Sequence, residues 1–146
     1  MERQAAVIYI DGSFDHVTNR IGCAILLSEN TNKKPQRIVY RKQLRSQVKY
    51  GSNIAEMTAA KTAIKIACSL GLKQVDIHHD WNGVEHFSHK DNIKCRHKYC
   101  SVFSNYAQYI ENARRKLDIN FVKVKAHSCD EKNIMVDMMA RTGVVI

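Results

Sequence analysis

Three short apolar stretches follow one another in the first 45 residues, with polar turns between them. Residues 5–10 form an apolar run that ends at Asp11 and Gly12, residues 21–28 form a second run, and residues 37–45 form a third, more polar one. Short apolar runs bounded by turn residues are typical of strands. We therefore expect an antiparallel meander whose polar third strand lies at an edge of the sheet.

The remainder of the chain alternates between helical and strand patterns. Apolar residues recur at helical spacing from about residue 54 to residue 70, and Ser52 or Asn53 is placed to cap this helix. Residues 73–79 are then expected to form a fourth strand that ends at Asp80. The remaining elements that we expect are a short helix over 82–87, a helix over 100–116, a strand over 119–125 and a helix over 131–142.

The predicted order of elements is βββαβαβα. Helical crossovers between strands are right-handed and connect parallel strands, so the fourth and fifth strands should run parallel to the first. These features predict an α/β protein with a five-stranded mixed sheet and helices on both faces. The length of 146 residues suits a single domain spanning residues 1–146.

Composition narrows the class of protein. Apolar residues make up 45% of the chain, which is ordinary for a folded protein. No apolar stretch approaches the roughly 20 residues needed to cross a bilayer, and the N-terminus lacks a signal-peptide pattern, so we expect a cytoplasmic protein without a membrane role. The formal net charge of +9 favours a polyanionic partner such as nucleic acid, although solubility alone would also explain it.

Four carboxylates are predicted to meet at one end of the sheet. Asp11 and Asp80 each follow a predicted strand, and parallel neighbouring strands place such residues side by side at the carboxyl edge. Glu56 lies in the first turns of the helix that follows the meander, and Asp137 lies in the last helix. All four side chains can therefore converge.

Each acidic residue has a plainer explanation when taken alone. Asp11 suits a turn, Glu56 a solvated helix surface and Asp80 a helix N-cap, whereas Asp137 lies in an apolar stretch where a charge needs a partner. Together, four carboxylates without matching cations would repel one another. Divalent ions remove this repulsion, and oxygen ligands favour Mg²⁺ or Mn²⁺ over zinc. Two such ions would support displacement at a phosphodiester.

The motifs around these carboxylates resemble those of type 1 ribonuclease H. The resemblance rests on Tyr9-Ile10-Asp11-Gly12-Ser13, Asn53-Ile54-Ala55-Glu56, Asp80 after a strand, Val124-Lys125-Ala126-His127 and the final Asp137. It covers nearly the whole chain, in order. It is closest to the bacterial branch whose members often carry an N-terminal hybrid-binding or viroplasmin-like domain. No such domain is expected to precede this core.

The resemblance implies an RNase H-like fold and an endonuclease that cuts the RNA strand of RNA/DNA hybrids with two Mg²⁺ or Mn²⁺ ions. The products would carry 5′-phosphate and 3′-hydroxyl ends. In that family, Asp11 would be shared by both ions, and Asp137 would complete the site of the ion that activates water. Glu56 and Asp80 would hold the ion at the leaving oxygen, and His127 would assist proton transfer or product release.

The resemblance also implies substrate contacts. Asn53 and the backbone near Gly12 and Ser13 match positions that approach RNA 2′-hydroxyls, which distinguish RNA from DNA. Ser52 and Asn82 match positions of polar contacts in the minor groove. Asn53 has the alternative role of a helix cap, and it could serve both purposes.

A basic loop is a candidate handle for backbone phosphates. It contains Lys90, Lys94, Arg96, His97 and Lys98, and a plainer explanation is a solvated loop. Three positions depart from the family pattern: Gly51 replaces a threonine that binds a DNA-strand phosphate, Ile134 replaces a glutamate, and Cys129 replaces a glycine in the histidine loop. None of these changes removes a metal ligand, and we expect the protein to act as a monomer.

Two other functions remain open on the residues alone. An RNase H-like domain with a weakened site would bind nucleic acid without cutting it, and metal-dependent cleavage distinguishes the two. A zinc-binding interaction module is the second alternative, because His86, His89, Cys95 and Cys100 lie within fifteen residues. Their spacing lacks the close cysteine pairs of structural zinc sites.

Overall fold

Five strands form one mixed sheet in the order β3-β2-β1-β4-β5. The computed structural model describes residues 6–28, 36–45, 50–94, 100–125 and 130–145. Antiparallel pairing joins β1 to β2 and β2 to β3, while β4 pairs in parallel with both β1 and β5. The predicted meander, the parallel fourth and fifth strands and the edge position of the third strand are confirmed. The strands are β1 (Ala6–Asp15), β2 (Arg20–Ser28), β3 (Gln36–Gln43), β4 (Gln74–His79) and β5 (Asp118–Lys123).

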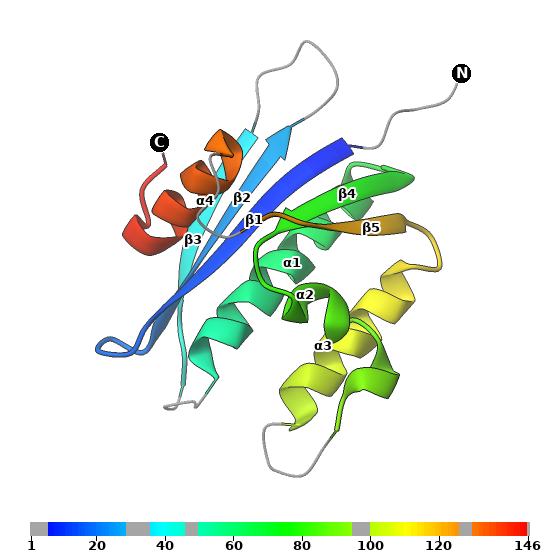
Figure 1. Ribbon diagram of the computed structural model, residues 1–146, viewed down its shortest axis with the longest axis horizontal. Coiled ribbons are helices and arrows are strands. Elements are labelled where there is room, and N and C mark those ends of the chain that lie inside the picture. Colours follow the sequence, from blue (N-terminus) through cyan, green and yellow to red (C-terminus); the bar gives the residue numbers. More distant parts are fainter. Residues whose placement is uncertain (1–5, 29–35, 46–49, 95–99, 126–129, 146) are drawn as a thin grey trace.

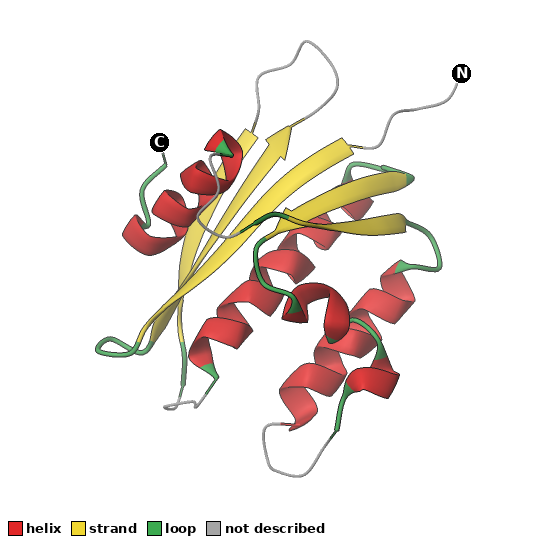
Figure 2. Ribbon diagram, in the orientation of Figure 1, coloured by secondary structure: helices red, strands yellow, loops and turns green. Residues whose placement is uncertain are grey.

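Helices cover both faces of this sheet, as predicted (Figure 1; Figure 2). One face carries α4, and the other carries α1 with α3 and the short α2 beside it. The helices are α1 (Gly51–Ser69), α2 (Gly83–His86), α3 (Cys100–Ala113) and α4 (Glu131–Thr142), with a 3₁₀ turn η1 (Lys90–Asn92) before α3. None of the helices in the described part of the chain is long and apolar enough to cross a membrane.

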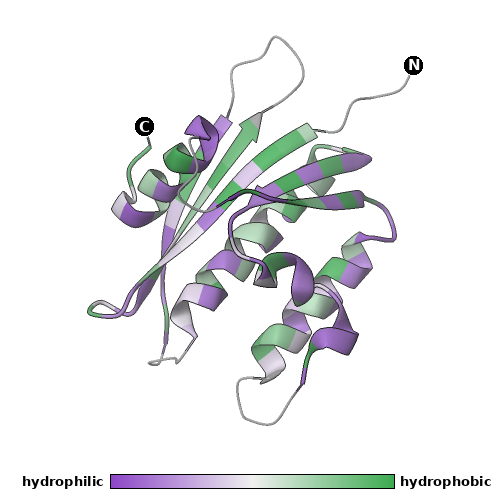
Figure 3. Cartoon of the chain, in the orientation of Figure 1, coloured by the Kyte–Doolittle hydropathy of each residue, from purple (hydrophilic) through white to green (hydrophobic). Residues whose placement is uncertain are grey.

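The sheet separates two hydrophobic clusters because side chains alternate between its faces. Along β1, Ile8 and Ile10 face α1, whereas Tyr9 faces α4. Figure 3 shows the apolar residues concentrated in β2 and in the first half of β1. The cluster under α1 is the larger, and small alanines let this helix lie close to the sheet. The buried alanines of α1 are Ala55, Ala59, Ala60, Ala63 and Ala67.

The first strand is longer than the sequence predicts, and this corrects the placement of Asp11. We expected the strand to end in a turn at Asp11 and Gly12, but β1 continues to Asp15 because its residues remain paired with β2. The parallel pairing with β4 stops at Tyr9. Asp11 therefore lies within a strand, just beyond the point where β1 and β4 part. The prediction that it lies at the carboxyl edge near Asp80 still holds.

The start of α1 is a second correction. The helix begins at Gly51 and not near residue 54, so Ser52 and Asn53 lie in its first turn. The cap is Tyr50, and no side chain caps this end. Gly51 explains the earlier start, because a Cβ there would lie 2.4 Å from the ring of Phe14. The missing side chain lets the first helical turn lie directly against β1.

The boundaries of α4 agree with the sequence prediction over residues 131–142. Asp130 caps this helix by accepting hydrogen bonds from the backbone N–H groups of Lys132 and Asn133 at 3.0 and 3.2 Å. Gly143 ends it with a φ of 71°, a left-handed conformation that glycine adopts without a steric penalty. Both signals are local, which is why the pattern of the sequence reveals them.

Candidate active site

Three carboxylates from three elements gather at one end of the sheet. Asp11 lies on β1, Glu56 lies in α1, and Asp80 directly follows β4. One oxygen from each side chain can be chosen so that all three lie within 4.8 Å of one another. Asp11 and Glu56 are buried, with exposed fractions of 4% and 8%, and Asp80 is partly exposed. Of the three side chains, Asp80 is therefore the most accessible to solvent.

Glu56 reaches this cluster because Gly12 has no side chain. Residues of β1 alternate, so Asp11 shares the α4 face with Tyr9 while Gly12 faces α1. A Cβ at Gly12 would lie 2.4–2.6 Å from the backbone of Ala55 and Glu56, which is closer than real Cβ atoms approach. The helix and the strand are therefore in backbone contact here. This contact brings a carboxylate from the far face of the sheet to Asp11.

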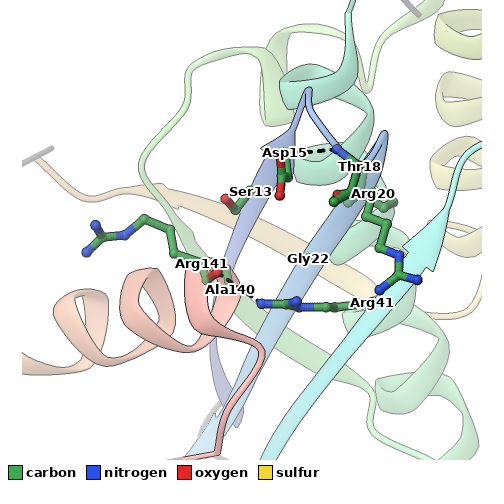
Figure 4. Close-up of a pocket in the computed structure, with 9 residues that line it drawn as sticks. Ser13, Asp15, Thr18, Arg20, Gly22, Arg41, Ala140 and Arg141 are labelled. Carbon is green, nitrogen blue, oxygen red and sulfur yellow. Dashed lines mark hydrogen bonds between the residues drawn. The ribbon is translucent and has the colours of Figure 1, made fainter. Parts of the chain in front are cut away.

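Asp137 lies beside the three-residue cluster and is not part of it. Its carboxylate pairs at 3.0 Å with Arg141, one helical turn later in α4, and is 44% exposed. Figure 4 shows the side chain of Arg141 extending away from Arg41, whose guanidinium donates to the backbone oxygen of Arg141 at 3.3 Å. The charge and a hydrogen bond of Asp137 both act on Asp11. All four predicted carboxylates thus lie at one end of the sheet.

The buried acids hold protons more tightly than carboxyls in water. Burial raises the pKa of Asp11 to about 7; a hydrogen bond with Glu56 acts against this rise, and the charge of Asp80 adds to it. Burial also raises the pKa of Glu56 well above its usual value, and the negative charge of Asp11 is the next cause. In the metal-free protein, burial therefore opposes the ionisation of both acids.

The donor set fits divalent cations. All of its ligand atoms are carboxylate oxygens, which Mg²⁺ and Mn²⁺ prefer. Among the described residues, the Oε2 atom of Glu56 is buried without a hydrogen-bond partner. An unpaired buried carboxylate oxygen is costly, and a bound cation would supply the missing partner. Asp11, Glu56 and Asp80 are the residues that could hold it.

The other predicted site residues surround this cluster to different degrees. Gly12 and Ser13 continue β1 beyond Asp11, and Asn53 lies one turn before Glu56. Ser52 is exposed at the start of α1, Asn82 is exposed at the start of α2, and Lys94 is exposed after η1. His127 lies outside the described residues, as do Cys129 and the loop residues Arg96, His97 and Lys98. Cys95, one of the four candidate zinc ligands, is also outside them.

Two features of the site were missed by the sequence prediction. The first is Arg141 as the partner of Asp137, for which the spacing of four residues in a helix was an available signal. The second is the steric role of Gly12, which was considered only for its backbone contacts. No signal in a single sequence shows that a helix will cross β1 at this residue.

Comparison with known proteins gives the same result as the geometry. The sequence model of the RNase H family matches residues 3–145. The chain belongs to the RNase H family. A comparison with curated protein sequences gave no match.

Solved structures share the RNase H fold with this chain. One is RNase H1 from the halophilic archaeon Halobacterium salinarum, with a TM-score of 0.67 and 14% identity, covering 94% of this chain and 96% of that one. Another is the N-terminal RNase H domain of a Mycobacterium tuberculosis protein, solved as a fusion with maltose-binding protein. Its TM-score is 0.63 at 18% identity, covering 94% of this chain and 97% of that one.

The strand order β3-β2-β1-β4-β5 is the RNase H pattern. Membership of the RNase H family indicates that this chain is a nuclease. The acidic cluster of this chain could bind a metal ion. The two solved relatives come from an archaeon and a mycobacterium, and at these identities they support the fold alone. They do not distinguish one branch of the RNase H family from another.

Proposed function

We propose that this protein is a metal-dependent endonuclease that hydrolyses the RNA strand of RNA/DNA hybrids, leaving 5′-phosphate and 3′-hydroxyl ends. The observation that carries the proposal is the cluster of Asp11, Glu56 and Asp80 within 4.8 Å in a chain of the RNase H family. The unpaired Oε2 of Glu56 adds support, because it is a buried ligand atom without a partner in the described residues.

The carboxylates are proposed to hold two ions, Mg²⁺ or Mn²⁺. Asp11 would be shared between them, Asp137 would complete one site, and Glu56 with Asp80 would complete the other. When bound, the ions would activate a water molecule and stabilise the leaving 3′ oxygen. Asp137 pairs with Arg141 through its Oδ2 atom, and because both side chains are partly exposed this pair is weak and would not prevent Asp137 from contributing. His127 is proposed to assist proton transfer or product release.

The proposed substrate contacts lie on both sides of the acidic cluster. Gly12 and Ser13 extend from Asp11 along β1, and Ser52 and Asn53, exposed and partly exposed respectively, lie in the first turn of α1. Short polar groups at these positions could hydrogen-bond to ribose 2′-hydroxyls. Asn82 and Lys94 are proposed to contact the duplex on the side of α2. Because no side chain caps α1, the alternative role of Asn53 as a helix cap is wrong.

The proposal includes further expectations. Residues 1–146 are proposed to form one catalytic domain, which the family match over residues 3–145 supports. The protein is proposed to act as a monomer and in the cytoplasm, with an RNA/DNA hybrid as its partner.

The test is cleavage of an end-labelled RNA/DNA hybrid by the purified protein in Mg²⁺, Mn²⁺ or EDTA. The Asp80→Asn variant is run alongside, because it removes a charge with little change in volume. Duplex RNA, duplex DNA and single strands serve as control substrates. We expect cutting of the hybrid alone, abolished by EDTA and reduced at least a hundredfold in Asp80→Asn, as expected for loss of a ligand to a catalytic metal.

Two results would contradict the proposal. A folded protein that binds the hybrid but cuts it with neither metal would be an RNase H-like binding module. Cleavage at the wild-type rate by Asp80→Asn would show that the acidic cluster is not the active site.

A further inference from the structure

A buried histidine, His79, directly precedes Asp80 in the sequence. His79 is the last residue of β4 and is only 1% exposed. Its Nδ1 atom lies 2.9 Å from the backbone oxygen of Trp81, the residue after Asp80. A carbonyl oxygen can only accept a hydrogen bond, so Nδ1 carries the proton and donates. This bond spans Asp80 and ties the backbone on one side of it to the side chain on the other.

The backbone carbonyl of Trp81 also takes part in further hydrogen bonds that reach α3. The backbone oxygen of Trp81 also accepts from the N–H of Val84, at 3.1 Å, in the first turn of α2. The oxygen of Val84 in turn accepts from the hydroxyl of Tyr106 in α3, at 2.7 Å. Tyr106 is 1% exposed, so this network is fixed in the protein interior. His79 extends it to β4.

The ring of His79 is itself held in place from β5. It packs edge-on against Phe121, with ring centroids 6.0 Å apart and an interplanar angle of 78°. The backbone oxygen of His79 accepts a hydrogen bond from the N–H of Val124, just after β5. The ring contact and the Nδ1 bond restrict the orientation of the imidazole, and the backbone bond holds the end of β4 beside the residues that follow β5. Its other nitrogen, Nε2, is buried without a hydrogen-bond partner among the described residues.

We propose that His79 is a positioning residue for Asp80: its Nδ1–H bond to Trp81 sets the backbone from which the Asp80 carboxylate reaches Asp11 and Glu56. The inference rests on the proposed function, because it concerns the same metal site. Outer groups that hydrogen-bond directly to a metal ligand change metal affinity by about 10–100-fold. His79 acts on Asp80 through the backbone, so we expect an effect at the lower end of this range. The plainer role of a buried histidine is to fill the core, where only its volume would matter.

Two substitutions separate the hydrogen bond from the volume. His79→Phe keeps a flat ring against Phe121 and removes the donor. His79→Asn removes most of the ring, but its amide nitrogen branches from the same position as Nδ1 and can donate to the same carbonyl. Ile25→Val, in the fully buried core of β2, controls for a loss of stability alone. Asp80→Asn reports whether Asp80 is a metal ligand at all.

The measurement is Mn²⁺ binding to each full-length protein without nucleic acid, followed by calorimetry or by the electron paramagnetic resonance of free Mn²⁺. We expect His79→Phe to raise the dissociation constant about tenfold. His79→Asn should stay within about threefold of the wild type, and Ile25→Val should not change it. A role confined to filling the core predicts the reverse order, because Phe replaces the volume of the ring better than Asn does.

Three results would overturn the inference. Wild-type affinity in His79→Phe, with weakened binding in Asp80→Asn, would refute the positioning role and leave the proposed metal site intact. A loss in His79→Asn that equals or exceeds the loss in His79→Phe would show that the Nδ1 donor is not the cause and would refute the positioning role. Unchanged binding in Asp80→Asn would refute both the proposed metal site and the role of His79.

A spectroscopic readout keeps the inference testable even where a variant does not fold. In the wild-type protein, nitrogen-15 spectra of the His79 ring should show a protonated Nδ1 and an unprotonated Nε2. The Nδ1 proton should exchange slowly with water because it is buried and bonded. An Nε2–H tautomer would exclude donation to Trp81 and would overturn the inference directly.

Discussion

At the scale of single residues, the carboxylates that make the site are also a source of instability. Asp11 and Glu56 are both buried, which raises the pKa of each, and the charge of Asp11 further disfavours a charge on Glu56. In the absence of a cation, the two carboxyl groups either stay protonated or carry negative charges that are buried and repel each other. Stability without metal should therefore depend on pH in a direction set by these two groups.

The first prediction concerns that dependence. The pKa of Asp11 rises from 3.8 to about 7 on folding, so between these values the folded protein holds a proton that the unfolded chain has released. The contribution of Asp11 to stability is thus fully present below about pH 4 and is lost as the pH rises through about 7, and the raised pKa of Glu56 acts in the same direction. A pKa change of this size corresponds to at most about 4 kcal/mol. Thermal unfolding in EDTA, from pH 5 to pH 8, measures it.

The control is Asp11→Asn, which removes one of the titrating groups. In EDTA at pH 8 this inactive variant should be more stable than the wild type, and the advantage should shrink at pH 5. Saturating Mg²⁺ should stabilise the wild type and not the variant. If, in EDTA, the wild type instead became more stable relative to Asp11→Asn as the pH rises, the raised pKa of Asp11 would be contradicted.

Residues with a strong chemical signature could be predicted from the sequence. Asp11, Glu56 and Asp80 were placed in one cluster because each follows or begins an element at the same edge of the sheet. The partner of Asp137 was not predicted, although Arg141 lies four residues later. The topology of the sheet decides which carboxylates come together, and the order of elements in the sequence predicts that topology. Whether a carboxylate then faces a metal site or pairs with a cation depends on distances that the sequence pattern does not contain.

At the scale of elements, the site depends on how closely α1 lies against β1. The bounds of α4 were predicted correctly, and the structure shows that local features, the Asp130 cap and Gly143, set its two ends. Local signals did not predict the start of α1 or the end of β1, since both are decided by contacts between elements. Gly51 lies under Phe14, and residues 11–15 stay in the strand through pairing with β2. Tertiary contacts override local turn signals at these two places.

The second prediction tests the contact between α1 and β1. In Gly12→Ala, the new Cβ collides with the backbone of Ala55 and Glu56, which cannot move like a flexible side chain. We expect a loss of about 1–3 kcal/mol in the free energy of unfolding. Mn²⁺ affinity should fall as well, because the helix that carries Glu56 is pushed away from Asp11. Urea unfolding and Mn²⁺ titration of the same preparation measure the two effects.

Gly71→Ala is the matched control for this prediction. Gly71 has a φ of 71° and open space around its Cβ position, so alanine there is strained but meets no neighbour. It should cost about 1 kcal/mol of stability and leave Mn²⁺ affinity unchanged. If Gly12→Ala also kept its affinity, the spacing between α1 and β1 would not control the site.

The third prediction concerns the cap of α4. Asp130 accepts from two backbone N–H groups of the helix and from the hydroxyl of Tyr9 at 3.2 Å. Asp130→Ala should lower the free energy of unfolding by about 1 kcal/mol. Asp130→Asn should lower it by much less, because its amide oxygen can still accept the capping hydrogen bonds. Chemical denaturation of both variants provides the comparison. Equal losses in the two variants would show that the charge of Asp130, and not its capping bonds, is what stabilises this end of α4.

At the scale of the whole molecule, a net positive charge is combined with an acidic site. The net charge is +9, although the candidate site itself gathers four carboxylates. Attraction of a polyanion therefore has to come from basic residues around the site. Such attraction depends on salt, because each phosphate contact releases counterions.

The fourth prediction assigns one of these contacts. On the Asp80→Asn protein in EDTA, the logarithm of hybrid affinity should fall linearly with the logarithm of salt concentration. Lys94→Gln should make this slope shallower by about 0.9 if its ammonium contacts a phosphate. Lys73, exposed before β4 at the opposite end of the sheet, is the matched control, and Lys73→Gln should leave the slope unchanged. Equal slopes for Lys94→Gln and the parent protein would remove Lys94 from the interface.

The two hydrophobic clusters differ greatly in size. The candidate site takes residues from both sides of the sheet, with Glu56 on α1 and Asp137 on α4. Among the described residues, 21 buried residues form the cluster under α1, and only seven form the cluster under α4. The smaller layer should open first in local unfolding, carrying Asp137 with it. An ion bound by Asp137 and Asp11 would then act as a cross-link between a stable layer and a labile one. Hydrogen–deuterium exchange of α4 should slow on adding Mn²⁺, while exchange in α1 changes little, so that loading with metal also completes the folding of the last helix.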